Sequence, residues 1–402
     1  MAAFAKLPAT AKTQPTPFTA STPESELNEF KELLKLSKVG KETYESTQKD
    51  RKYGITSDWL AEAKAQWEKF DWRKVEDEIN SFPNYTAKVK ESGDTFDIHF
   101  AALFSERTDA TPIIMLHGWP GSFLEFLPIL KLLKGKYTPQ TLPYHIIVPS
   151  LPGYAYSSPP PLHRDFRLEN CAEIVDNLMV GLGFGDGYVV QGGDVGSMVG
   201  RVLGALQPRA RAVHLNFCVV PDPGDDVPAA DVDEAERAGL LRGQAFLRLA
   251  TSYAFQHATK PSTVGLALSA SPLSLLAWIG EKFLDWTDED PPLDTILASV
   301  TLYWFTGCYP TSLWPYRRLF GPGAGAGIHE NPAWRIDGKP LGYSWFPKEL
   351  APTPRAWVAT TGNLVFSRQH RSGGHFAAME RPEVLLQDVE DFVAQVWPRP
   401  EA

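Results

Sequence analysis

The chain has 402 residues, of which 43% are hydrophobic and 22% charged, so it can bury a large core and form roughly two or three structural units. Its formal net charge is −9, and no run of like charge exceeds a few residues. This excludes the charge pattern typical of proteins that bind nucleic acid or an anionic membrane surface, and it favours a small, uncharged substrate.

Two further features point to the compartment in which the chain works. The cysteines Cys171, Cys218 and Cys308 are widely spaced and form no C-x-x-C pair, which argues against a disulfide framework or a zinc site and favours a reducing environment. The first 21 residues contain no continuous apolar segment, and no window approaches the ~18 apolar residues of a membrane span. We therefore expect a soluble, cytoplasmic protein.

The N-terminal part, residues 1–84, is predicted to be an extended arm followed by helices. Residues 1–20 show no periodicity. The next segment predicts a helix with Ser21 or Thr22 as N-cap and Pro23 in the first turn, and its apolar face consists of Leu27, Phe30, Leu33 and Leu34. A second helix is expected within residues 56–70, where apolar residues recur four apart, and a third is expected to begin at Asp71.

From Tyr85 the pattern changes to strands. Residues 85–89 and 96–104 predict a hairpin around the Ser92-Gly93-Asp94 turn. Short apolar runs then begin at residues 112, 144, 187 and 212, and helix-length amphipathic sequence separates them. This alternation is typical of parallel strands with crossover helices, so the fold class is α/β with a mostly parallel central sheet, and residues 85–219 form the first part of its core.

Residues 220–335 are aromatic-rich and helical in periodicity, without a convincing strand, and we interpret them as an inserted lid. A glycine-rich patch at residues 321–327 indicates a flexible loop. Strands return at residues 340–347 and 363–368, and a helix at 381–397 ends the chain, so residues 336–402 form the last part of the core.

The segment QGGDVG, Gln191 to Gly196, runs from an apolar β-branched segment through a glycine-flanked turn toward a helix. In this context a G-x-X-x-G turn usually raises a nucleophilic serine above the sheet, but here the apex residue is Asp194. The flanking glycines have a steric reason, because the turn is strained and leaves little room for a Cβ. The carboxylate has no structural reason and is the candidate nucleophile.

A catalytic aspartate also requires an oxyanion site. The segment HGWPGS, His117 to Ser122, follows a predicted strand directly, and a glycine-rich loop there can direct backbone N–H groups at a developing oxyanion. The N–H groups of Trp119 and Val195 are the predicted pair. The alternative is that HGWPG is only a tight turn.

The candidate base is His375, which follows paired glycines and opens a helix after the last predicted strand. A histidine in such a position is often structural. Its partner should lie between the nucleophile and the histidine, after the penultimate strand, where Glu349 is found. Glu349 could also be a solvated surface residue. Asp337 is a weaker rival because it precedes the strand, and the order Asp194, Glu349, His375 strengthens the set.

No G-x-S-x-G motif exists: Ser344 has Gly342 before it but Phe346 where a second glycine should stand. This argues against a serine esterase. A carboxylate nucleophile suits attack on an sp³ carbon that carries a strained or good leaving group, with water then cleaving the resulting ester. An unperturbed aspartate, with a pKa of about 3.9, is ionised at neutral pH.

With these residues the chain resembles an epoxide hydrolase of the α/β-hydrolase superfamily, in the soluble fungal form of the microsomal-type branch. The resemblance covers nearly the whole chain, including HGWPGSFLEF, SLPGY, QGGDVGS, TKPSTVGLALSASPLSLLAWIGEKF, FPKEL and GGHFAAMERP. It implies an α/β-hydrolase fold with Asp194 as nucleophile and His375 as the base that activates water. It also implies that Glu349 orients His375, at a position where members carry Asp or Glu.

The resemblance further implies two lid tyrosines that hold and protonate the epoxide oxygen. Tyr253 precedes the TKP segment, and Tyr316 is the second match, with Tyr303 and Tyr309 as nearby rivals. Any one of these tyrosines could instead serve packing alone. A phenol is chemically suitable because its pKa of about 10 keeps it protonated at neutral pH while it donates to a nascent alkoxide. The resemblance implies a homodimer as well.

We therefore expect a cofactor-independent and metal-independent enzyme that converts an epoxide and water into a vicinal diol, with lipophilic or aryl epoxides favoured by the apolar lid. The physiological role, detoxification or biosynthesis, stays open. One alternative is a haloalkane dehalogenase, but such enzymes commonly carry a tryptophan after the nucleophile, where this chain has Val195. The other is a non-catalytic binding protein that retains the fold.

Overall fold

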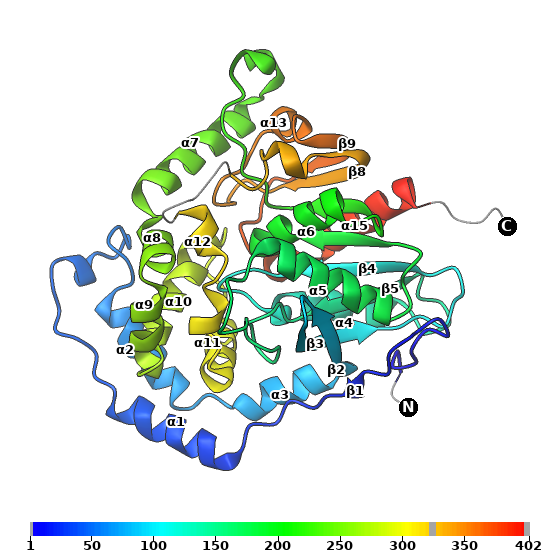
Figure 1. Ribbon diagram of the computed structural model, residues 1–402. Coiled ribbons are helices and arrows are strands. Elements are labelled where there is room, and N and C mark those ends of the chain that lie inside the picture. Colours follow the sequence, from blue (N-terminus) through cyan, green and yellow to red (C-terminus); the bar gives the residue numbers. More distant parts are fainter. Residues whose placement is uncertain (1–2, 321–326, 398–402) are drawn as a thin grey trace.

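A computed structural model describes residues 3–320 and 327–397, and its centre is one nine-stranded sheet (Figure 1). The strand order is β1-β2-β3-β5-β4-β6-β7-β8-β9. The strands are β1 Thr16–Pro17, β2 Asn84–Glu91, β3 Asp94–Leu103, β4 Thr111–Leu116, β5 Tyr144–Pro149, β6 Tyr188–Gly192, β7 Ala210–Leu215, β8 Ile336–Trp345 and β9 Gly362–Gln369. Strands β4 to β9 are parallel, whereas β1, β2 and β3 pair antiparallel. The predicted α/β class and the predicted hairpin are confirmed.

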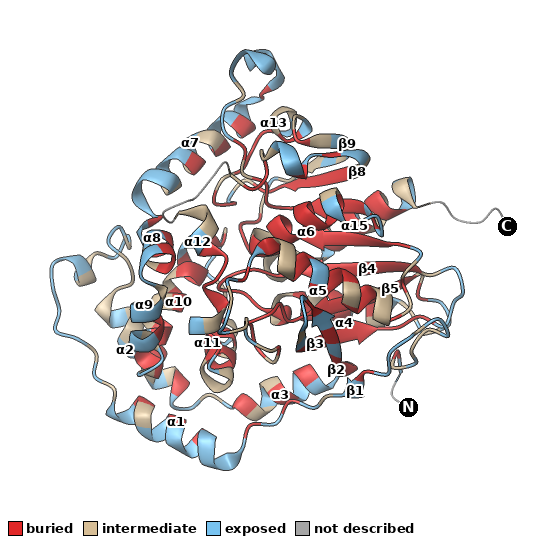
Figure 2. Ribbon diagram, in the orientation of Figure 1, coloured by how far each residue is buried: buried red, intermediate tan, exposed pale blue. Residues whose placement is uncertain are grey.

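Helices cover both faces of the sheet. α5 and α6 contact each other on one face, and α4 contacts α15 on the other (Figure 1). These helices are α4 Leu127–Lys136, α5 Leu168–Gly181, α6 Asp194–Leu206 and α15 Pro382–Val396. Two short helices, α13 Arg355–Ala359 and α14 Ala377–Glu380, lie before and after β9 in the sequence. Because both faces are covered, β4, β5 and β6 are buried at every position, which explains their continuous apolar runs (Figure 2).

The N-terminal arm leads into α1, Glu24–Leu36, which buries Leu27, Phe30 and Leu34. The predicted N-cap is wrong: the cap residue is Pro23, and no side chain caps the helix. The reason is tertiary, because the Thr22 hydroxyl accepts a hydrogen bond from Trp72 Nε1 at 2.9 Å, and its N–H donates to Glu76 at 2.5 Å. The arm also contributes β1, a strand that the sequence did not predict.

The next two helices begin as expected. α2, Ser57–Trp67, is capped by the Thr56 side chain, and α3, Trp72–Asn80, by Asp71. The Trp67 indole N–H donates at 2.8 Å to Thr301 Oγ1 of α11, Leu293–Thr306. The N-terminal helices therefore pack against the region predicted to be the lid.

Residues 220–320 and 327–335 contain helices and turns but no strand. The helices are α7 Glu234–Leu249, α8 Ser252–Thr259, α9 Pro261–Leu268, α10 Pro272–Trp286, α11 Leu293–Thr306 and α12 Tyr316–Leu319. Short 3-10 turns in the chain are η1 Glu45–Thr47, η2 Phe123–Phe126, η3 Gly224–Asp226, η4 Ala229–Asp231, η5 Pro310–Ser312 and η6 Pro332–Trp334. Most of the predicted flexible loop, residues 321–326, lies outside the described residues. In the described part of the chain no single helix is long and apolar enough to cross a membrane; only α9 and α10 taken together, across a bend of 118°, reach that length and composition.

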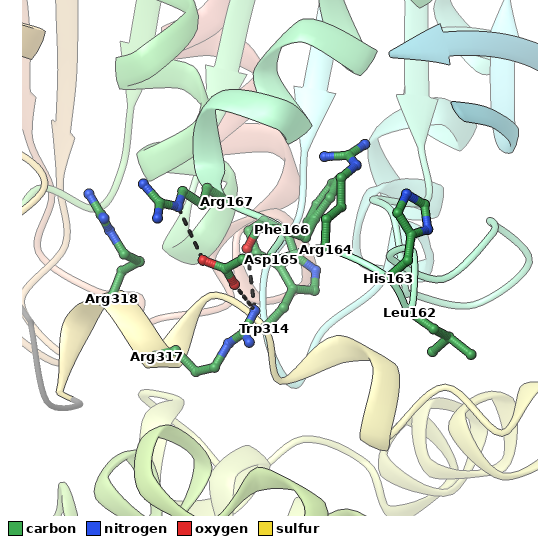
Figure 3. Close-up of a pocket in the computed structure, with 9 residues that line it drawn as sticks. All are labelled: Leu162, His163, Arg164, Asp165, Phe166, Arg167, Trp314, Arg317 and Arg318. Atoms are coloured by element: carbon green, nitrogen blue, oxygen red, sulfur yellow. Dashed lines mark hydrogen bonds and ion pairs between the residues drawn. The ribbon is translucent and has the colours of Figure 1, made fainter. Parts of the chain in front are cut away.

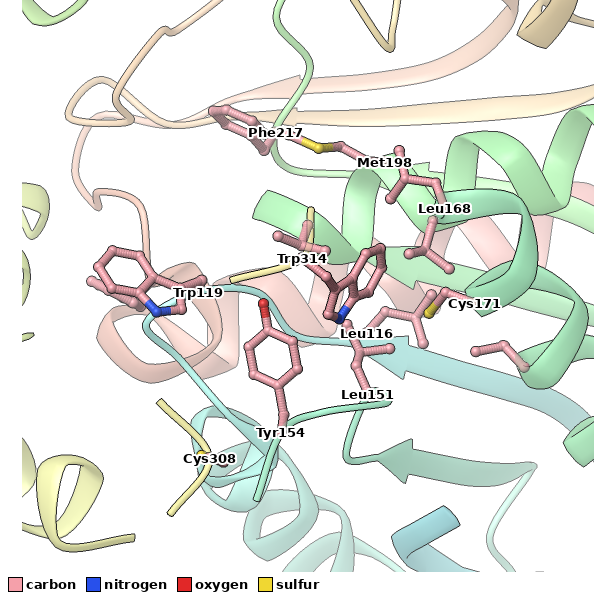
Figure 4. Close-up of a cluster of buried hydrophobic side chains, with 14 of the residues drawn as sticks. Leu116, Trp119, Leu151, Tyr154, Leu168, Cys171, Met198, Phe217, Cys308 and Trp314 are labelled. Carbon is pink, nitrogen blue, oxygen red and sulfur yellow. The ribbon is translucent and has the colours of Figure 1, made fainter. Parts of the chain in front are cut away.

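A buried apolar cluster joins the sheet to the lid (Figure 4). It includes side chains that follow the core strands, side chains from α5 and α6, and side chains from the segment before α12: Leu116, Leu151, Tyr154, Leu168, Cys171, Met198, Cys308 and Trp314. Polar atoms fix the same junction, since the Tyr154 hydroxyl donates to Ser312 O at 2.9 Å and Trp314 Nε1 donates to Pro152 O at 3.0 Å. The start of α12 is therefore anchored to the core.

An ion pair at the surface adds a second anchor for α12. Asp165, in the loop before α5, lies 2.7 Å from Arg317 and 3.1 Å from Arg167, at the edge of a surface pocket of 670 Å³ (Figure 3). Arg317 directly follows Tyr316. The ion pair thus holds the helix that carries a predicted catalytic tyrosine.

Candidate active site

Asp194 stands at the sharp turn between β6 and α6. Its φ of 45° lies in the left-handed region, which a non-glycine residue rarely adopts. A Cβ at Gly196 would lie 2.1 Å from Leu116 O, and one at Gly192 would lie 2.3 Å from Gly196 O. The two glycines are therefore required by close backbone approach, as the sequence predicted, and the turn leaves the Asp194 side chain 17% exposed.

The loop after β4 faces this carboxylate. The Trp119 N–H donates to Asp194 Oδ1 at 2.7 Å. A Cβ at Gly118 would lie 2.1 Å from the same oxygen, so only glycine lets the loop come this close. His117 holds the loop, because its Nδ1 lies 3.1 Å from Gly118 O and its Nε2 accepts from the Leu151 N–H at 3.1 Å. The second predicted donor, the Val195 N–H, lies in the first turn of α6, and its role stays a prediction.

His375 and Glu349 form a buried pair next to Asp194. His375 Nε2 lies 3.4 Å from Asp194 Oδ2, and its Nδ1 lies 2.6 Å from Glu349 Oε1. Burial alone lowers the pKa of His375, but the charges of Glu349 and Asp194, and the hydrogen bonds to them, raise that pKa well above its usual value. The imidazole therefore links the two carboxylates, in the geometry that a general base requires.

The structure separates the two candidate acids. Glu349 follows β8 and has a side chain that is 1% exposed. Its rival Asp337 lies within β8, has a side chain that is 62% exposed, and is paired with Arg335 at 2.8 Å. Asp337 is too far out on the surface to orient His375.

The His375 loop is attached to the lid through its backbone. The His375 N–H donates to Trp286 O at 2.9 Å, at the end of α10. Glu380 accepts from the N–H groups on either side of the histidine, Gly374 at 3.1 Å and Phe376 at 3.0 Å, and also from Asp288 at 2.7 Å. These hydrogen bonds thus fix the position of His375 relative to both the core and the lid.

Tyr253 of α8 and Tyr316 of α12 meet above the nucleophile. Their ring centroids are 5.8 Å apart, and the rings of both lie near the Trp119 ring, whose centroid is 5.4 Å from that of Tyr253 and 5.7 Å from that of Tyr316. The Trp119 ring stacks on Tyr253 at 5.4 Å. Burial raises the pKa of both phenols, and the Asp194 charge raises it further, so both remain protonated at neutral pH.

The two rival tyrosines are engaged elsewhere. The Tyr303 hydroxyl donates to Gly121 O at 2.9 Å, and the Tyr309 hydroxyl lies 3.0 Å from His257 Nε2. These hydroxyl groups are already used in protein contacts. The geometry favours Tyr316 as the partner of Tyr253.

Ser344 is buried away from the site. Its hydroxyl lies 3.1 Å from His214 Nε2 and donates to the Asp388 carboxylate. All three residues are buried, with exposed fractions of 0%. This set resembles a catalytic triad in residue types only, because the serine is inaccessible to a substrate and donates to the acid instead of the histidine.

Three polar residues next to the site were not identified from the sequence: Glu125, Asn216 and Glu380. Asn216 follows β7, and its Oδ1 accepts from Gln191 Nε2 at 2.8 Å. Glu125 occupies the third position of a capping box with Ser122. An S-x-x-E pattern directly after HGWPG was visible in the sequence and could have identified Glu125, although capping alone would have explained it.

The site can perform nucleophilic substitution followed by ester hydrolysis. It combines the Asp194 carboxylate, one observed N–H donor, a buried histidine paired with a carboxylate, and two phenols. No group of three or more metal-binding side chains occurs among residues 3–320 and 327–397.

Comparisons with known proteins show which family the chain resembles. The family model described as "Epoxide hydrolase N terminus" matches residues 15–126, and the one described as "alpha/beta hydrolase fold" matches residues 111–274. A putative epoxide hydrolase of Dothistroma septosporum is 46% identical over 399 residues, covering 98% of this chain and 93% of that protein. Epoxide hydrolase 1 of Sus scrofa is 32% identical over 415 residues, covering 94% and 88%.

Solved structures also match over nearly the full chain. The epoxide hydrolase of Aspergillus niger is 50% identical with a TM-score of 0.93, covering 98% of this chain and 100% of that one. The juvenile hormone epoxide hydrolase of Bombyx mori is 27% identical with a TM-score of 0.83, covering 96% and 95%. The family implied by the sequence motifs is confirmed, and the chain belongs to the epoxide hydrolases of the α/β-hydrolase fold.

Proposed function

We propose that this enzyme opens its epoxide through a covalent ester on Asp194, which water activated by His375 then cleaves to a vicinal diol. One observation carries the proposal. The Asp194 carboxylate lies 3.4 Å from the buried His375–Glu349 pair, and it accepts from the N–H of Trp119, whose ring contacts those of Tyr253 and Tyr316 at 5.4 and 5.7 Å.

In the first step Asp194 attacks one ring carbon of the epoxide from the side opposite the C–O bond. That bond breaks, and the oxygen takes a proton from one of the two phenols. The phenols donate to an oxygen that becomes far more basic than they are, so their contribution grows as the ring opens. The product is an ester that carries a free hydroxyl group.

In the second step His375 removes a proton from water, and the oxygen of that water attacks the ester carbonyl. The Trp119 N–H, and by our proposal the Val195 N–H, stabilise the tetrahedral oxyanion. Glu349 holds His375 Nδ1 in its protonated tautomer, leaving Nε2 free to accept the proton. Collapse of the intermediate expels the diol and regenerates Asp194.

The surroundings of Asp194 support lipophilic or aryl epoxides as substrates. Aromatic rings surround Tyr253, with the centroids of Trp119 at 5.4 Å, Trp286 at 5.2 Å and His257 at 5.5 Å. Such rings bind apolar and aromatic surface and offer little to a charged group. We propose such compounds as the substrate class and detoxification of them as the role.

A paired assay tests the reaction type. We expect diol from styrene oxide and no halide release from a short chloroalkane, because the residue after the nucleophile is Val195 and supplies no indole donor for a halide. Halide release without diol formation would show that the enzyme is a dehalogenase. Failure to hydrate any member of a broad epoxide panel would support a binding role instead.

The two phenols are expected to act in ring opening alone. We expect single Tyr253→Phe and Tyr316→Phe variants to form the ester roughly 10- to 100-fold more slowly and the double variant more than about 10³-fold more slowly, within the range for general acids. The rate of ester hydrolysis should change little. Rapid-quench kinetics measure both steps, with Tyr309→Phe as the matched control. Equal slowing of both steps would contradict this role.

Glu349 is expected to control both the tautomer and the pKa of His375. A Glu349→Gln variant should hydrolyse the ester about 10³- to 10⁴-fold more slowly, as in other triads whose acid is replaced by an amide. Because Glu349 raises the pKa of His375 and only the neutral imidazole accepts a proton, the remaining activity should reach its plateau at a lower pH than in the wild type.

The pH profile of single-turnover hydrolysis gives this measurement. Glu349→Asp, which keeps the charge and matches other members of the family, is the control and should retain more activity than the amide variant. An unchanged profile in Glu349→Gln would show that His375 does not depend on this carboxylate.

We further propose that the enzyme acts in the cytoplasm as a homodimer. Apolar side chains on α7 to α9 support a lid-mediated contact, since Leu241, Leu249 and Leu266 are 68%, 72% and 72% exposed and Phe255 is 50% exposed. Light scattering after gel filtration should give twice the 44.6 kDa chain mass. A monomer mass at micromolar concentration would refute the dimer.

A further inference from the structure

The surface pocket of Figure 3 has a cationic lining that the proposed reaction does not use. Its volume of 670 Å³ lies within the range of roughly 300–1,000 Å³ that is typical of small-molecule sites. Four of the residues that line it are arginines: Arg164, Arg167, Arg317 and Arg318. The chain as a whole carries a net charge of −9, so this concentration of positive charge is a local feature and does not follow from the composition.

The one carboxylate in the lining does not balance these arginines. Asp165 lies 2.7 Å from Arg317 and 3.1 Å from Arg167. Arg318 has no ion-pair partner among residues 3–320 and 327–397. Because arginine stays protonated in proteins, three positive charges face one negative charge. The pocket therefore has an excess of two positive charges.

The remaining cationic side chains of the pocket are already neutralised. Arg164 donates at 2.9 Å to Asp94 and at 2.5 Å to Glu91. His163 lies 3.7 Å from the same Asp94 carboxylate. The unbalanced charge therefore belongs to the three other arginines, which come from the start of α5 and from α12.

These three guanidinium groups have hydrogen-bond donors to spare. Each carries five N–H donors in a planar fork, and one carboxylate occupies only a few of them. The side chains of Arg167 and Arg317 are 51% and 44% exposed, so a ligand can reach their other donors. A phosphate monoester offers three acceptor oxygens and a charge of about −1.5 to −2 at neutral pH. It matches the excess charge of the pocket, whereas a carboxylate supplies half of it.

Buried contacts hold the two segments that carry the arginines. Trp314, just before α12, donates from Nε1 to Pro152 O at 3.0 Å, and its ring packs edge-on against Phe166 at 4.9 Å. Both rings are buried. The two walls of the pocket are thus fixed before a ligand binds, which lowers the entropic cost of binding.

An apolar residue in the lining indicates that the ligand carries an organic group. The side chain of Leu162 is fully exposed, and it lines the same pocket as the arginines (Figure 3). The pocket is also much larger than a single inorganic ion. A small organic phosphate therefore fits it better than phosphate alone.

We propose that this pocket binds a phosphate monoester through Arg167, Arg317 and Arg318. Asp165 competes with such a ligand, because it occupies donors of Arg167 and Arg317. None of the residues that line this pocket lines the pocket at Asp194, so the site is separate from the reacting groups and does not rest on the proposed mechanism.

Calorimetric titration of the full chain with phenyl phosphate, at neutral pH and constant ionic strength, tests the site. We expect one saturable site per chain. Arg167→Gln and Arg318→Gln should each weaken binding at least about 5-fold, because charge-assisted hydrogen bonds are lost. Asp165→Asn should tighten it about 3-fold or more, because a like charge is removed. Arg355→Gln, at the exposed start of α13, is the matched control and should bind as the wild type does.

Phosphate monoesters also occur as lipid headgroups, and a second measurement separates the two sources. The protein is sedimented with phosphatidylcholine vesicles that contain or lack phosphatidic acid. Binding of phenyl phosphate without binding to either vesicle would support a soluble ligand. Binding only to the vesicles with phosphatidic acid, lost in Arg318→Gln, would support the same site with a lipid headgroup as its ligand.

Three results would overturn the proposal. The first is the absence of saturable binding of either probe. The second is equal affinity in the wild type and Arg318→Gln, since the ligand would then bind elsewhere. The third is weaker binding in an Asp165→Asn variant with an unchanged melting temperature, since Asp165 would then support the ligand instead of competing with it. Arg318 makes no ion pair within the described chain, so its replacement should leave the fold intact.

Discussion

An Asp194→Asn variant is expected to lose turnover by about 10⁴- to 10⁶-fold, the usual effect of removing a catalytic nucleophile. A loss of 10⁴ corresponds to about 5.4 kcal/mol of transition-state stabilisation. Asparagine suits the test because, like aspartate, it tolerates the left-handed backbone observed at this position, where φ is 45°. The fold should therefore survive, and the lost activity reports the chemistry of the carboxylate.

Steady-state kcat with styrene oxide and thermal melting of the same preparation check this prediction. Asp186, two residues before the start of β6, provides a matched Asp→Asn control. Turnover within tenfold of the wild type in a folded Asp194→Asn variant would show that Asp194 is not the nucleophile.

A His375→Gln variant is expected to trap the covalent intermediate. Asp194 remains able to attack the epoxide, but the group 3.4 Å away that should activate water is lost. We expect ester formation to continue while hydrolysis slows by at least about 10³-fold, within the range for general base catalysis. The protein should gain the mass of one epoxide per chain.

Intact-protein mass spectrometry after mixing with excess epoxide measures the adduct, and peptide mapping locates it. His163→Gln is the control, because the His163 side chain is 67% exposed and lies at the surface pocket of Figure 3. An adduct on another residue, or unmodified protein that has stopped turning over, would show that His375 does not act after ester formation.

Much of the core could be predicted because its signals are local. The buried parallel strands are continuous apolar runs, and the elbow at Asp194 requires glycine at Gly192 and Gly196 for steric reasons that the sequence alone displays. The chain order of Asp194, Glu349 and His375 also restricts the acid to the segment between the penultimate strand and the histidine. In the structure these three side chains lie together.

Features that depend on distant partners could not be predicted. Thr22 is of a residue type that commonly caps helices, yet its hydroxyl accepts a hydrogen bond from Trp72, 50 residues away in the sequence. The choice of Tyr316 over Tyr303 and Tyr309 depends on which hydroxyl groups are already bonded, and only the tertiary structure shows this. Local propensity gives way to tertiary contacts in both cases.

Glu125 illustrates a different limit. Its position three residues after Ser122 is fully explained by a capping box, and a residue with a sufficient structural role gives no sign of a second one. Its position beside the site is visible only in the folded chain, where it lines one small pocket with Asp194 and His375, which come from other parts of the sequence. Spatial convergence of this kind has no local signature.

The most direct test of the central claim is a single turnover in ¹⁸O-water with enzyme in excess over epoxide. If Asp194 forms the new carbon–oxygen bond, the first diol carries an unlabelled oxygen from the carboxylate, and the label enters Asp194 instead. Label in the diol after this first turnover would mean that water attacks the epoxide directly, and the covalent mechanism would be wrong.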